Sequence, residues 1–243
     1  MAIPDEATSL TVEDGAAAPF TLNLHTDEQV RARSVVIATG ARYRRIDVQN
    51  STPASVHYWA SPIEAKLCAN EEVALVGAGN SAGQAAVYLA SQGAKVSMLV
   101  RRDDLAATMS RYLVDRIRSL TNVEVMTGAT VSGLEGHDGI LEAVRWRLGA
   151  TGQEVRRSIR HLFLFIGAEP NTAWLVNSGI TLDAKGFILT GDDAGRDRHS
   201  LETTRRGVFA IGDVRAKSVK RVAAAVGEGA QVVAALHSFL TTT

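Results

Sequence analysis

The sequence predicts an α/β fold, and three observations in its middle third carry that prediction. Val73–Val76 form a continuous apolar run of the kind that is buried on both faces of a parallel sheet. An Ala-rich helix is expected from Ser81 to Gln92, with Gly93 at the position where helices commonly end. Lys95–Val100 form a second strand. The order strand, tight turn, helix, strand is typical of a parallel βαβ unit.

The elements on the N-terminal side of this unit are expected to be mostly strands. The runs "TSLTVED", "PFTLNLHT" and "QVRARSVVIATG" are rich in β-branched residues and separated by turn residues, which predicts an antiparallel meander. The meander should end in a buried strand, Val35–Ala38. Residues 41–62 look irregular and are the best candidate for a linker. A short helix is expected over residues 63–69.

The elements on the C-terminal side mix helices, strands and a long loop region. Met109, Leu113, Ile117 and Leu120, together with Tyr112, form an apolar stripe that predicts a helix over residues 109–120. The runs "NVEVMTG", "ATVSGLEG", "ILEAVRWRLG" and "EVRRSIRHLFLFIG" predict strands. Residues 171–205 are rich in loops, with one strand expected at Phe187–Thr190. A short buried strand in "GVFAIGDV" and a helix from about Ser218 to Phe239 complete the chain.

Composition describes an ordinary globular chain. Its 243 residues are enough for one large or two small domains, and a content of 46% apolar residues is usual for a soluble protein. The 26 basic and 26 acidic residues cancel to a net charge of zero. Because a general nucleic-acid binder needs a basic excess, no nucleic-acid partner is predicted.

The start of the chain and its apolar runs indicate a cytoplasmic protein. The first residues, "MAIPDEATS", are acidic and contain no apolar signal-peptide core. The runs "SVVIATGA" and "HLFLFIGA" have the length of strands and fall short of the roughly 18 residues that a membrane helix needs. We therefore expect a cytoplasmic protein that does not associate with membranes.

Cysteine and histidine restrict the chemistry further. Cys68 is the sole cysteine, so the chain can form neither an intramolecular disulfide nor a redox pair of its own. The six histidines are scattered, and none stands at a recognised metal-ligand spacing from another histidine, a cysteine or a carboxylate. No metal site is predicted.

The turn of the βαβ unit has the spacing of a dinucleotide-binding fingerprint. In "GAGNSA", Gly77 permits the tight turn, Gly79 lets the backbone approach a pyrophosphate, and Ala82 permits close packing of helix on strand. Asn80 and Ser81 stand at the helix N-terminus, where free N–H groups and the helix dipole favour an anion. The alternative is a tight turn that binds no ligand.

The residues after the second strand bear on which dinucleotide binds. An NAD site usually places an acidic residue about 20 residues beyond the glycines, to bond the ribose 2′-hydroxyl. Here Arg101 and Arg102 stand in that region, and two guanidinium groups suit a 2′-phosphate. NADPH is therefore predicted over NADH. Asp103 and Asp104 follow. Their carboxylates either accept a hydrogen bond from a ribose hydroxyl or form ion pairs with the arginines. Alternatively, all four residues belong to a charged, solvated loop that binds no ligand.

The order of motifs resembles the thioredoxin reductase-like pyridine nucleotide–disulfide oxidoreductases. The motifs that carry the resemblance are "SVVIATGA", "GAGNSA", "VRR", "IGAEPNT", "TTRRGVFAIGDV" and "KRVAAAVGEGAQVV". The resemblance implies an α/β fold of two nested, three-layer, Rossmann-like domains. Residues 1–43 and 168–243 would form a partial FAD-binding domain, and residues 44–167 an inserted NAD(P)H-binding domain.

The resemblance also implies where FAD would bind. Asp213 would bond the ribitol, unless it merely caps a loop, and Val222 stands where the family usually has Gln, so a backbone contact alone is expected there. The final helix would place its positive end under a reduced, anionic flavin, or would alternatively only pack in the core. The residues implied on the FAD side are Thr39 and Gly40 near the first crossing, Gly167 at the return crossing, Gly212, Asp213, Arg221, Val222 and Ala223.

One departure from the family is large. Its FAD domain begins with a strand, a G-x-G-x-x-G turn and a helix, whereas residues 1–34 here read as a meander. The expectation is a chain that begins midway through a truncated FAD domain. Such a chain alone should bind FAD poorly, because the cradle for the FAD pyrophosphate is missing.

A second departure lies in "HYWASP", residues 57–62. Thioredoxin-reducing members carry a C-x-x-C pair at this place, and the resemblance puts Trp59 and Pro62 at the two cysteine positions. Cys68 follows six residues late and alone. The chain is closer to a bacterial branch with similar "YWASP" stretches, whose members are often fused behind an N-terminal regulatory domain. Trp59 either covers a flavin face or packs against neighbouring residues.

Two functions follow as hypotheses. The first is an FAD-dependent NADPH oxidoreductase, similar to thioredoxin reductase, that passes hydride from NADPH to FAD and on to an acceptor without an internal dithiol. The second is a non-catalytic NADPH-binding or regulatory module that has lost flavin. The acceptor is unknown, with a thioredoxin-like or other electron-carrier protein as candidates, and a homodimer is left open. No side chain is predicted to be catalytic.

Overall fold

The computed structural model describes residues 5–13, 15, 18–46 and 55–242, which form two compact units. The continuous unit spans Tyr43–Gly167, and the split unit combines Met1–Arg42 with Ala168–Thr243. The sequence placed the boundaries at residues 43/44 and 167/168. Each unit has its own sheets and core, so they are described separately.

The continuous unit is built on a five-stranded sheet in which every pair of neighbouring strands is parallel. The predicted βαβ unit lies at its centre, because the strands at Glu72–Val76 and Lys95–Val100 are hydrogen-bonded neighbours joined by a helix at Asn80–Ser91. In sheet order the strands are β6 (Val56–His57), β13 (Leu162–Leu164), β7 (Glu72–Val76), β8 (Lys95–Val100) and β9 (Val123–Thr127).

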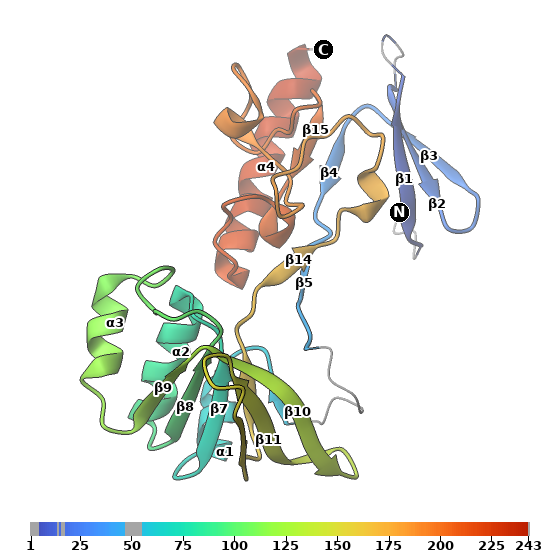
Figure 1. Ribbon diagram of the computed structural model, residues 1–243. Coiled ribbons are helices and arrows are strands. Elements are labelled where there is room, and N and C mark those ends of the chain that lie inside the picture. The colour runs from blue at the N-terminus through green and yellow to red at the C-terminus, as the bar shows by residue number, and fades with distance from the viewer. Residues whose placement is uncertain (1–4, 14, 16–17, 47–54, 243) are drawn as a thin grey trace. The chain divides into compact units, whose positions relative to one another are not determined.

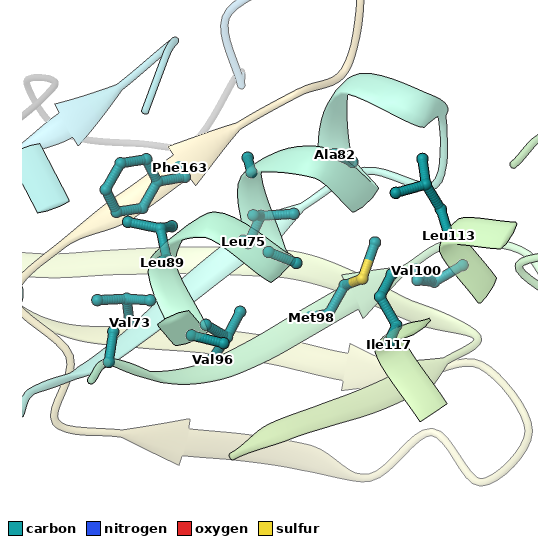
Figure 2. Packing of buried hydrophobic residues seen from close by; sticks show 14 of the residues in the cluster. Val73, Leu75, Ala82, Leu89, Val96, Met98, Val100, Leu113, Ile117 and Phe163 are labelled. Atoms are coloured by element: carbon teal, nitrogen blue, oxygen red, sulfur yellow. The ribbon is translucent and has the colours of Figure 1, made fainter. Parts of the chain in front are cut away.

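The two faces of this sheet are covered by different elements. Val73 and Leu75 of β7 point to one face, where they pack with α2 (Asn80–Ser91) and α3 (Arg111–Arg118) (Figure 2). Ala74, between them, packs on the opposite face. That face is covered by an antiparallel sheet of β10 (Ala129–His137), β11 (Ile140–Leu148) and β12 (Glu154–Arg157) (Figure 1). Helices, parallel sheet and antiparallel sheet therefore form successive layers.

An arginine on β12 ties the antiparallel sheet to the parallel one. The Nη1 atom of Arg157 lies 2.7 Å from Glu72 Oε1 on β7 and 2.8 Å from Glu124 Oε2 on β9. The guanidinium carbon also lies 5.5 Å from the ring centre of Trp146, which is fully buried. Burial opposes ionisation of Glu72, but hydrogen bonds from Arg157, Ser97 and Lys95 together lower its pKa.

The helix predicted over residues 109–120 is shorter than expected. It is α3, Arg111–Arg118, and Ser110, which caps its start in an extended conformation, donates its N–H group to Asn80 Oδ1 at 2.7 Å. Leu113 and Ile117 are buried as predicted. Tyr112 is 75% exposed and does not belong to the stripe, because the step of one residue turns its side chain away from the buried face.

The stretch predicted to be irregular, residues 41–62, contains regular elements. β5 (Ala41–Tyr43) pairs with β14 (Ala168–Pro170), and β6 adds the edge strand of the parallel sheet. The short helix α1 runs from Pro62 to Leu67 and begins with a capping box in which Ser61 and Glu64 bond each other's backbone N–H groups. Residues 47–54, which hold most of the polar linker, lie outside the described residues.

The split unit holds the predicted N-terminal meander, which is confirmed. β1 (Ala7–Val12), β2 (Phe20–Leu24) and β3 (Gln29–Ala32) form an antiparallel sheet. The third predicted run divides into β3 and β4 (Val35–Ile37), and β4 pairs in parallel with β15 (Val208–Ala210). In Figure 1, β4 and β15 lie side by side next to the long helix α4 (Val222–Thr242).

The strand predicted at Phe187–Thr190 is wrong. Ile188 forms isolated bridges with Leu182 and Arg215, but no regular ladder. The reason is local, because the side chain of Asp183 accepts the Phe187 N–H group at 2.9 Å and folds the chain into a turn at this point.

The final helix, predicted from about Ser218, begins later, at Val222. Its segment Val222–Thr241 is long and apolar enough to cross a membrane, judged by length and composition alone. This corrects the expectation that no segment would reach that length. Core helices of soluble proteins can have the same length and composition, so the segment by itself does not indicate a membrane protein.

Candidate functional site

The turn between β7 and α2 is shaped by a glycine that the fold itself requires. Gly77 has φ = +146°, a conformation that side-chain-bearing residues rarely adopt. A Cβ atom at Gly77 would also lie 2.6 Å from the backbone oxygen of Phe165. Ala82, fully buried, packs against the same point. These contacts explain the first and last positions of the fingerprint without any ligand.

The middle glycine is different. Gly79 has an ordinary φ of −87°, and a Cβ atom built on it would meet no atom within 4 Å. The fold therefore does not need a glycine here, whereas a ligand approaching the backbone would. Gly79 caps α2 without a side-chain hydrogen bond, and the side chain of Asn80 is engaged elsewhere. The first N–H groups of α2 near Ser81 can thus bind an anion such as a pyrophosphate.

The loop after β8 is fixed against this turn. Thr108 Oγ1 donates to the carbonyl of Ala78 at 2.8 Å, and the Ser110 N–H group donates to Asn80 Oδ1 at 2.7 Å. Arg101 and Arg102 stand at the start of the loop, directly after β8, and both are exposed. Because β7 and β8 are parallel neighbours, their carboxyl ends lie at the same edge of the sheet. The structure thus brings the glycine turn and the two arginines to one edge.

The two aspartates after the arginines do not neutralise them. Asp104 Oδ1 accepts the Ala106 N–H group at 3.1 Å, which is a local turn contact. Among the residues that the structure describes, no ion pair joins Arg101 or Arg102 to Asp103 or Asp104. Both guanidinium groups are therefore available for an anionic group of a ligand.

The predicted FAD-side residues of the split unit gather at the ends of two strands. Thr39 and Gly40 follow β4, and Gly212 and Asp213 follow β15, so all four lie at the same edge of a parallel pair. Thr39 and Asn171 form two hydrogen bonds. Thr39 Oγ1 donates to the Asn171 carbonyl at 2.9 Å, and Asn171 Nδ2 donates to the Thr39 carbonyl at 2.8 Å. The Asn171 N–H group also donates to the carbonyl of Gly40 at 3.0 Å.

The loop that carries Asp213 is held by residues that the sequence did not single out. Glu228 on α4 accepts the Gly212 N–H group at 2.6 Å and pairs with Arg215 at 2.5 Å. Burial opposes ionisation of Glu228, but the hydrogen bonds from Arg215 and Gly212 have the larger combined effect and lower the pKa of its carboxyl group. Lys220 Nζ donates to the Asp213 carbonyl at 2.9 Å and lies 4.2 Å from the ring centre of Phe187. No sequence motif signals these contacts.

The remaining predicted residues lie in two places. Arg221, Val222 and Ala223 stand at the start of α4 and are exposed, with Val222 at 83%. Gly167 stands at the end of the continuous unit, where its carbonyl accepts the Arg44 N–H group at 3.0 Å. Gly167 therefore lies where the chain leaves the continuous unit.

The residues of "HYWASP" form a small, ordered structure. Trp59 Nε1 donates to Glu64 Oε1 at 3.2 Å, and Pro62 is the first residue of α1. The ring of Tyr43 lies 6.0 Å from the ring of Tyr58, stacked, and 6.5 Å from that of Trp59, tilted by 50°. We call these three residues, Tyr43, Tyr58 and Trp59, the aromatic cluster.

Cys68 has none of the properties of a redox cysteine. Its side chain is fully buried in the core below α1 and α2. Burial, helped by the charges of Glu71 and Glu64, raises the pKa of the Cys68 thiol to about 12. Because the thiolate is the reactive form, this cysteine is chemically inert in the folded protein.

A pair of histidines lies in the continuous unit, and no motif in the sequence indicates it. His57 Nε2 lies 3.1 Å from His161 Nδ1, and the His57 ring stacks on Phe163 at 4.8 Å. The two residues are far apart in the chain, and the parallel pairing of β6 with β13 brings them together. The described residues contain no group of three potential metal ligands.

The histidine pair should make the stability of the protein depend on pH. Burial lowers the pKa of both rings, although Glu64 near His57 and Glu71 near His161 oppose the shift. A histidine whose pKa is lower in the folded than in the unfolded state stabilises the fold above about pH 6.5, and this contribution is lost as the pH falls. We expect the free energy of unfolding to drop by on the order of 1 kcal/mol between pH 7 and pH 5 from this pair.

Urea denaturation from pH 5 to pH 8 measures this loss. The double variant His57→Phe/His161→Gln should show a shallower dependence on pH than the parent. The matched control, His137→Gln, removes an exposed histidine of the same unit and should leave the slope as it was. Equal slopes for the parent and the double variant would show that the pair does not contribute.

The sequence matches a known protein family and several known proteins. Residues 5–229 match the profile of a family described as pyridine nucleotide-disulphide oxidoreductase. The chain is 32% identical over 241 residues to an alkyl hydroperoxide reductase protein of Staphylococcus aureus, covering 97% of this chain and 42% of that protein. It is 31% identical to NADPH-dependent thioredoxin reductase 3 of Arabidopsis thaliana, covering 98% of this chain and 44% of that protein. The chain thus spans less than half the length of these two relatives.

The fold is similar to that of a solved thioredoxin reductase. The structure from Streptococcus pyogenes superposes with a TM-score of 0.72 at 27% identity, over 98% of this chain and 74% of that one. The mixed α/β architecture with nested dinucleotide-binding domains, expected from the motifs, is that of this neighbour.

Proposed function

Because the chain belongs to the pyridine nucleotide-disulphide oxidoreductase family, we propose that it serves FAD-dependent oxidation of NADPH and delivers electrons to an acceptor without a dithiol of its own. The observation that carries the proposal is the edge where the open N-terminus of α2 meets two arginines that form no ion pair within the described part of the chain. In this proposal residues 44–167 form the NAD(P)H-binding domain, and residues 1–43 with 168–243 form part of the FAD-binding domain.

The continuous unit supplies the groups that NADPH would need. The N–H groups of Asn80 and Ser81 would bind the pyrophosphate, with Gly79 leaving room for it. The guanidinium groups of Arg101 and Arg102 would bind the 2′-phosphate, which NADH lacks. The name of the Arabidopsis relative, NADPH-dependent thioredoxin reductase 3, agrees with this choice of cofactor.

The split unit supplies groups that suit a flavin. When bound, FAD supplies the capacity to take a hydride and to release electrons to an acceptor. The Asp213 carboxylate would accept hydrogen bonds from the ribitol, on a loop that Glu228 and Lys220 hold in place. The N-terminus of α4 would place a positive dipole end near the ring through Val222 and Ala223. Thr39 and Gly40 would line the same edge.

In this proposal electrons do not leave through a disulfide within this chain. Cys68 is alone, fully buried and carries a thiol with a raised pKa. The acceptor would be a separate molecule, and a thioredoxin-like or other electron-carrier protein stays a candidate. Cytoplasmic location, a homodimer and the absence of nucleic-acid and membrane partners also stay predictions.

Anaerobic addition of NADPH to the FAD-loaded protein tests the proposal. We expect the long-wavelength absorbance band of the flavin to bleach, with NADH far less effective at the same concentration. Adding thioredoxin alone to the reduced protein should not restore the band quickly, because no dithiol connects the two. A flavin that stays oxidised in excess NADPH would contradict the proposed reaction.

A second candidate is a non-catalytic NADPH-binding module. It is favoured by one observation: the part of the chain that the structure describes has a single glycine-rich strand–turn–helix unit, at β7 and α2. Titration of flavin-free protein with NADPH distinguishes the two candidates. Tight NADPH binding together with failure to take up FAD would favour the module.

A further inference from the structure

The proposed function leaves open what orients the peptide group between Ala78 and Gly79, in the middle of the glycine turn. Among the described residues, the Gly79 N–H group has no hydrogen-bond partner. In a trans peptide the N–H group points opposite to the carbonyl of the same peptide, here that of Ala78. The direction of the Ala78 carbonyl therefore decides whether this part of the turn presents a donor or an acceptor to an anion.

This peptide group can flip more easily than most. A flip of the peptide plane would change the φ of Gly79 from −87° to a positive value, which glycine adopts about as readily as a negative one. The space beside Gly79 is open, since a Cβ atom built there would meet no atom within 4 Å. The flipped peptide would turn a carbonyl oxygen, with its partial negative charge, toward a bound pyrophosphate, and the two would repel. The glycine that leaves room for the ligand therefore needs a group that holds its peptide plane.

A side chain outside the fingerprint holds this peptide plane. Thr108 Oγ1, on the loop after β8, donates to the Ala78 carbonyl at 2.8 Å. The Thr108 backbone is itself anchored, because its N–H group donates to the Leu105 carbonyl at 3.2 Å and Leu105 is buried. Met109, also buried, packs where α2 carries Gly83, since a Cβ atom on Gly83 would lie 2.8 Å from Met109 Sδ. The hydroxyl of Thr108 thus reaches Ala78 from a fixed backbone.

A second hydrogen bond acts on the other side of Gly79. The Ser110 N–H group donates to the side-chain oxygen of Asn80, the first residue of α2, at 2.7 Å. The two bonds therefore join the loop to the residue before Gly79 and to the residue after it. The bond to Asn80 keeps Thr108 beside the turn, and the bond from Thr108 is the one that a peptide flip would break.

We propose that Thr108 is a positioning residue for the dinucleotide: its hydroxyl fixes the Ala78–Gly79 peptide so that the Gly79 N–H group is turned toward the pyrophosphate. This inference rests on the proposed function, which supplies the dinucleotide. It assigns to Thr108 an effect on the pyrophosphate, which NADPH and NADH share, and leaves the 2′-phosphate to Arg101 and Arg102.

Fluorescence titration of the 243-residue chain with NADPH and with NADH tests the role of Thr108. Thr108→Val keeps the shape of the side chain and removes the hydroxyl. We expect it to weaken binding of both dinucleotides by the same factor, about 5- to 10-fold, the loss expected for one hydrogen bond. Thr108→Ser restores a hydroxyl and should bind both within about twofold of the parent.

Adenosine 2′-monophosphate separates an effect on the peptide from an effect on the loop as a whole. It carries a 2′-phosphate but no pyrophosphate, so Thr108→Val should bind it like the parent, whereas Arg101→Ala/Arg102→Ala should lose most of this binding. Thr151→Val, which removes a hydroxyl from an exposed turn of the same unit, is the matched control and should bind all three ligands like the parent. Thermal unfolding, measured on every variant, checks that each is folded.

The outcomes distinguish this inference from the proposed function. Loss of adenosine 2′-monophosphate binding in Thr108→Val, or failure of Thr108→Ser to restore dinucleotide binding, would overturn the assignment, because the side chain would then act on the loop and not through its hydroxyl on the peptide. Equal dinucleotide affinities of the parent and Thr108→Val, with a flavin that NADPH bleaches, would refute the role of Thr108 and leave the reaction. A common loss for NADPH and NADH, in a protein whose flavin NADPH does not reduce, would refute the reaction and leave the role of Thr108. A parent that binds neither dinucleotide would refute both.

Discussion

Replacement of Gly79 by valine is expected to abolish NADPH binding, raising the dissociation constant at least about 100-fold, while the protein stays folded. The side chain would project into the space through which a pyrophosphate reaches the N–H groups of α2. The fold should tolerate the change, because φ is −87° and no atom lies within 4 Å of the added Cβ. The loss of a glycine cap should cost less than about 1 kcal/mol.

Gly77 provides the contrast that makes this test specific. Gly77→Ala would place a Cβ atom 2.6 Å from the Phe165 backbone oxygen at a φ of +146°, so this variant should lose its stability as well as its binding. NADPH titration and thermal unfolding, measured on both variants, separate the two effects. A Gly79→Val protein that binds NADPH with the parent affinity would remove the main support for the dinucleotide site.

The double variant Arg101→Ala/Arg102→Ala should lose the preference for NADPH. Each guanidinium–phosphate contact is charge-assisted, and such bonds contribute about 1.5–3 kcal/mol, reduced here by solvent exposure. We expect NADPH affinity to fall roughly 30-fold and NADH affinity to change less than about threefold. Stability should not change, because both side chains are exposed and unpaired among the described residues.

The matched control for the arginine pair is Arg118→Ala, which removes an exposed guanidinium from the end of α3. Binding of NADPH and NADH, measured by titration at two salt concentrations, gives the comparison. The preference of the parent should shrink at high salt, because exposed charges are screened. Equal losses for NADPH and NADH in the double variant would mean that the arginines do not read the 2′-phosphate.

The sequence predicted best those features whose causes are local. The apolar run of β7, the Ala-rich α2 and the left-handed Gly93 after it follow from neighbouring residues, and all three are present. Gly77, Gly79, Arg101 and Arg102 lie at one edge of the sheet, because the parallel pairing of β7 with β8 was predicted, whereas the parallel pairing of β4 with β15 was not. Tyr112 shows where prediction from local pattern fails. It was assigned to the apolar stripe, but it is one residue away from Leu113, and that step along the helix turns its side chain to solvent.

Features that depend on sheet order could not be predicted. His57 meets His161 because β6 and β13 happen to be neighbours in the sheet. Glu228 contacts Gly212 because α4 packs against the loop after β15. The aromatic cluster needs Tyr43 to return beside Trp59 across an intervening segment. A single sequence gives no information on such pairings, since each is decided by how elements pack.

The two places where the chain passes from one unit into the other have a consequence for folding. The continuous unit begins and ends where Arg44 bonds Gly167, and the split unit is closed where Asn171 bonds Thr39 and Gly40. If the continuous unit folds first, its two ends are already held together. The two halves of the split unit then meet across a short effective loop, which lowers the entropy that their closure would otherwise cost. The insertion can therefore act as the nucleus on which the surrounding unit assembles.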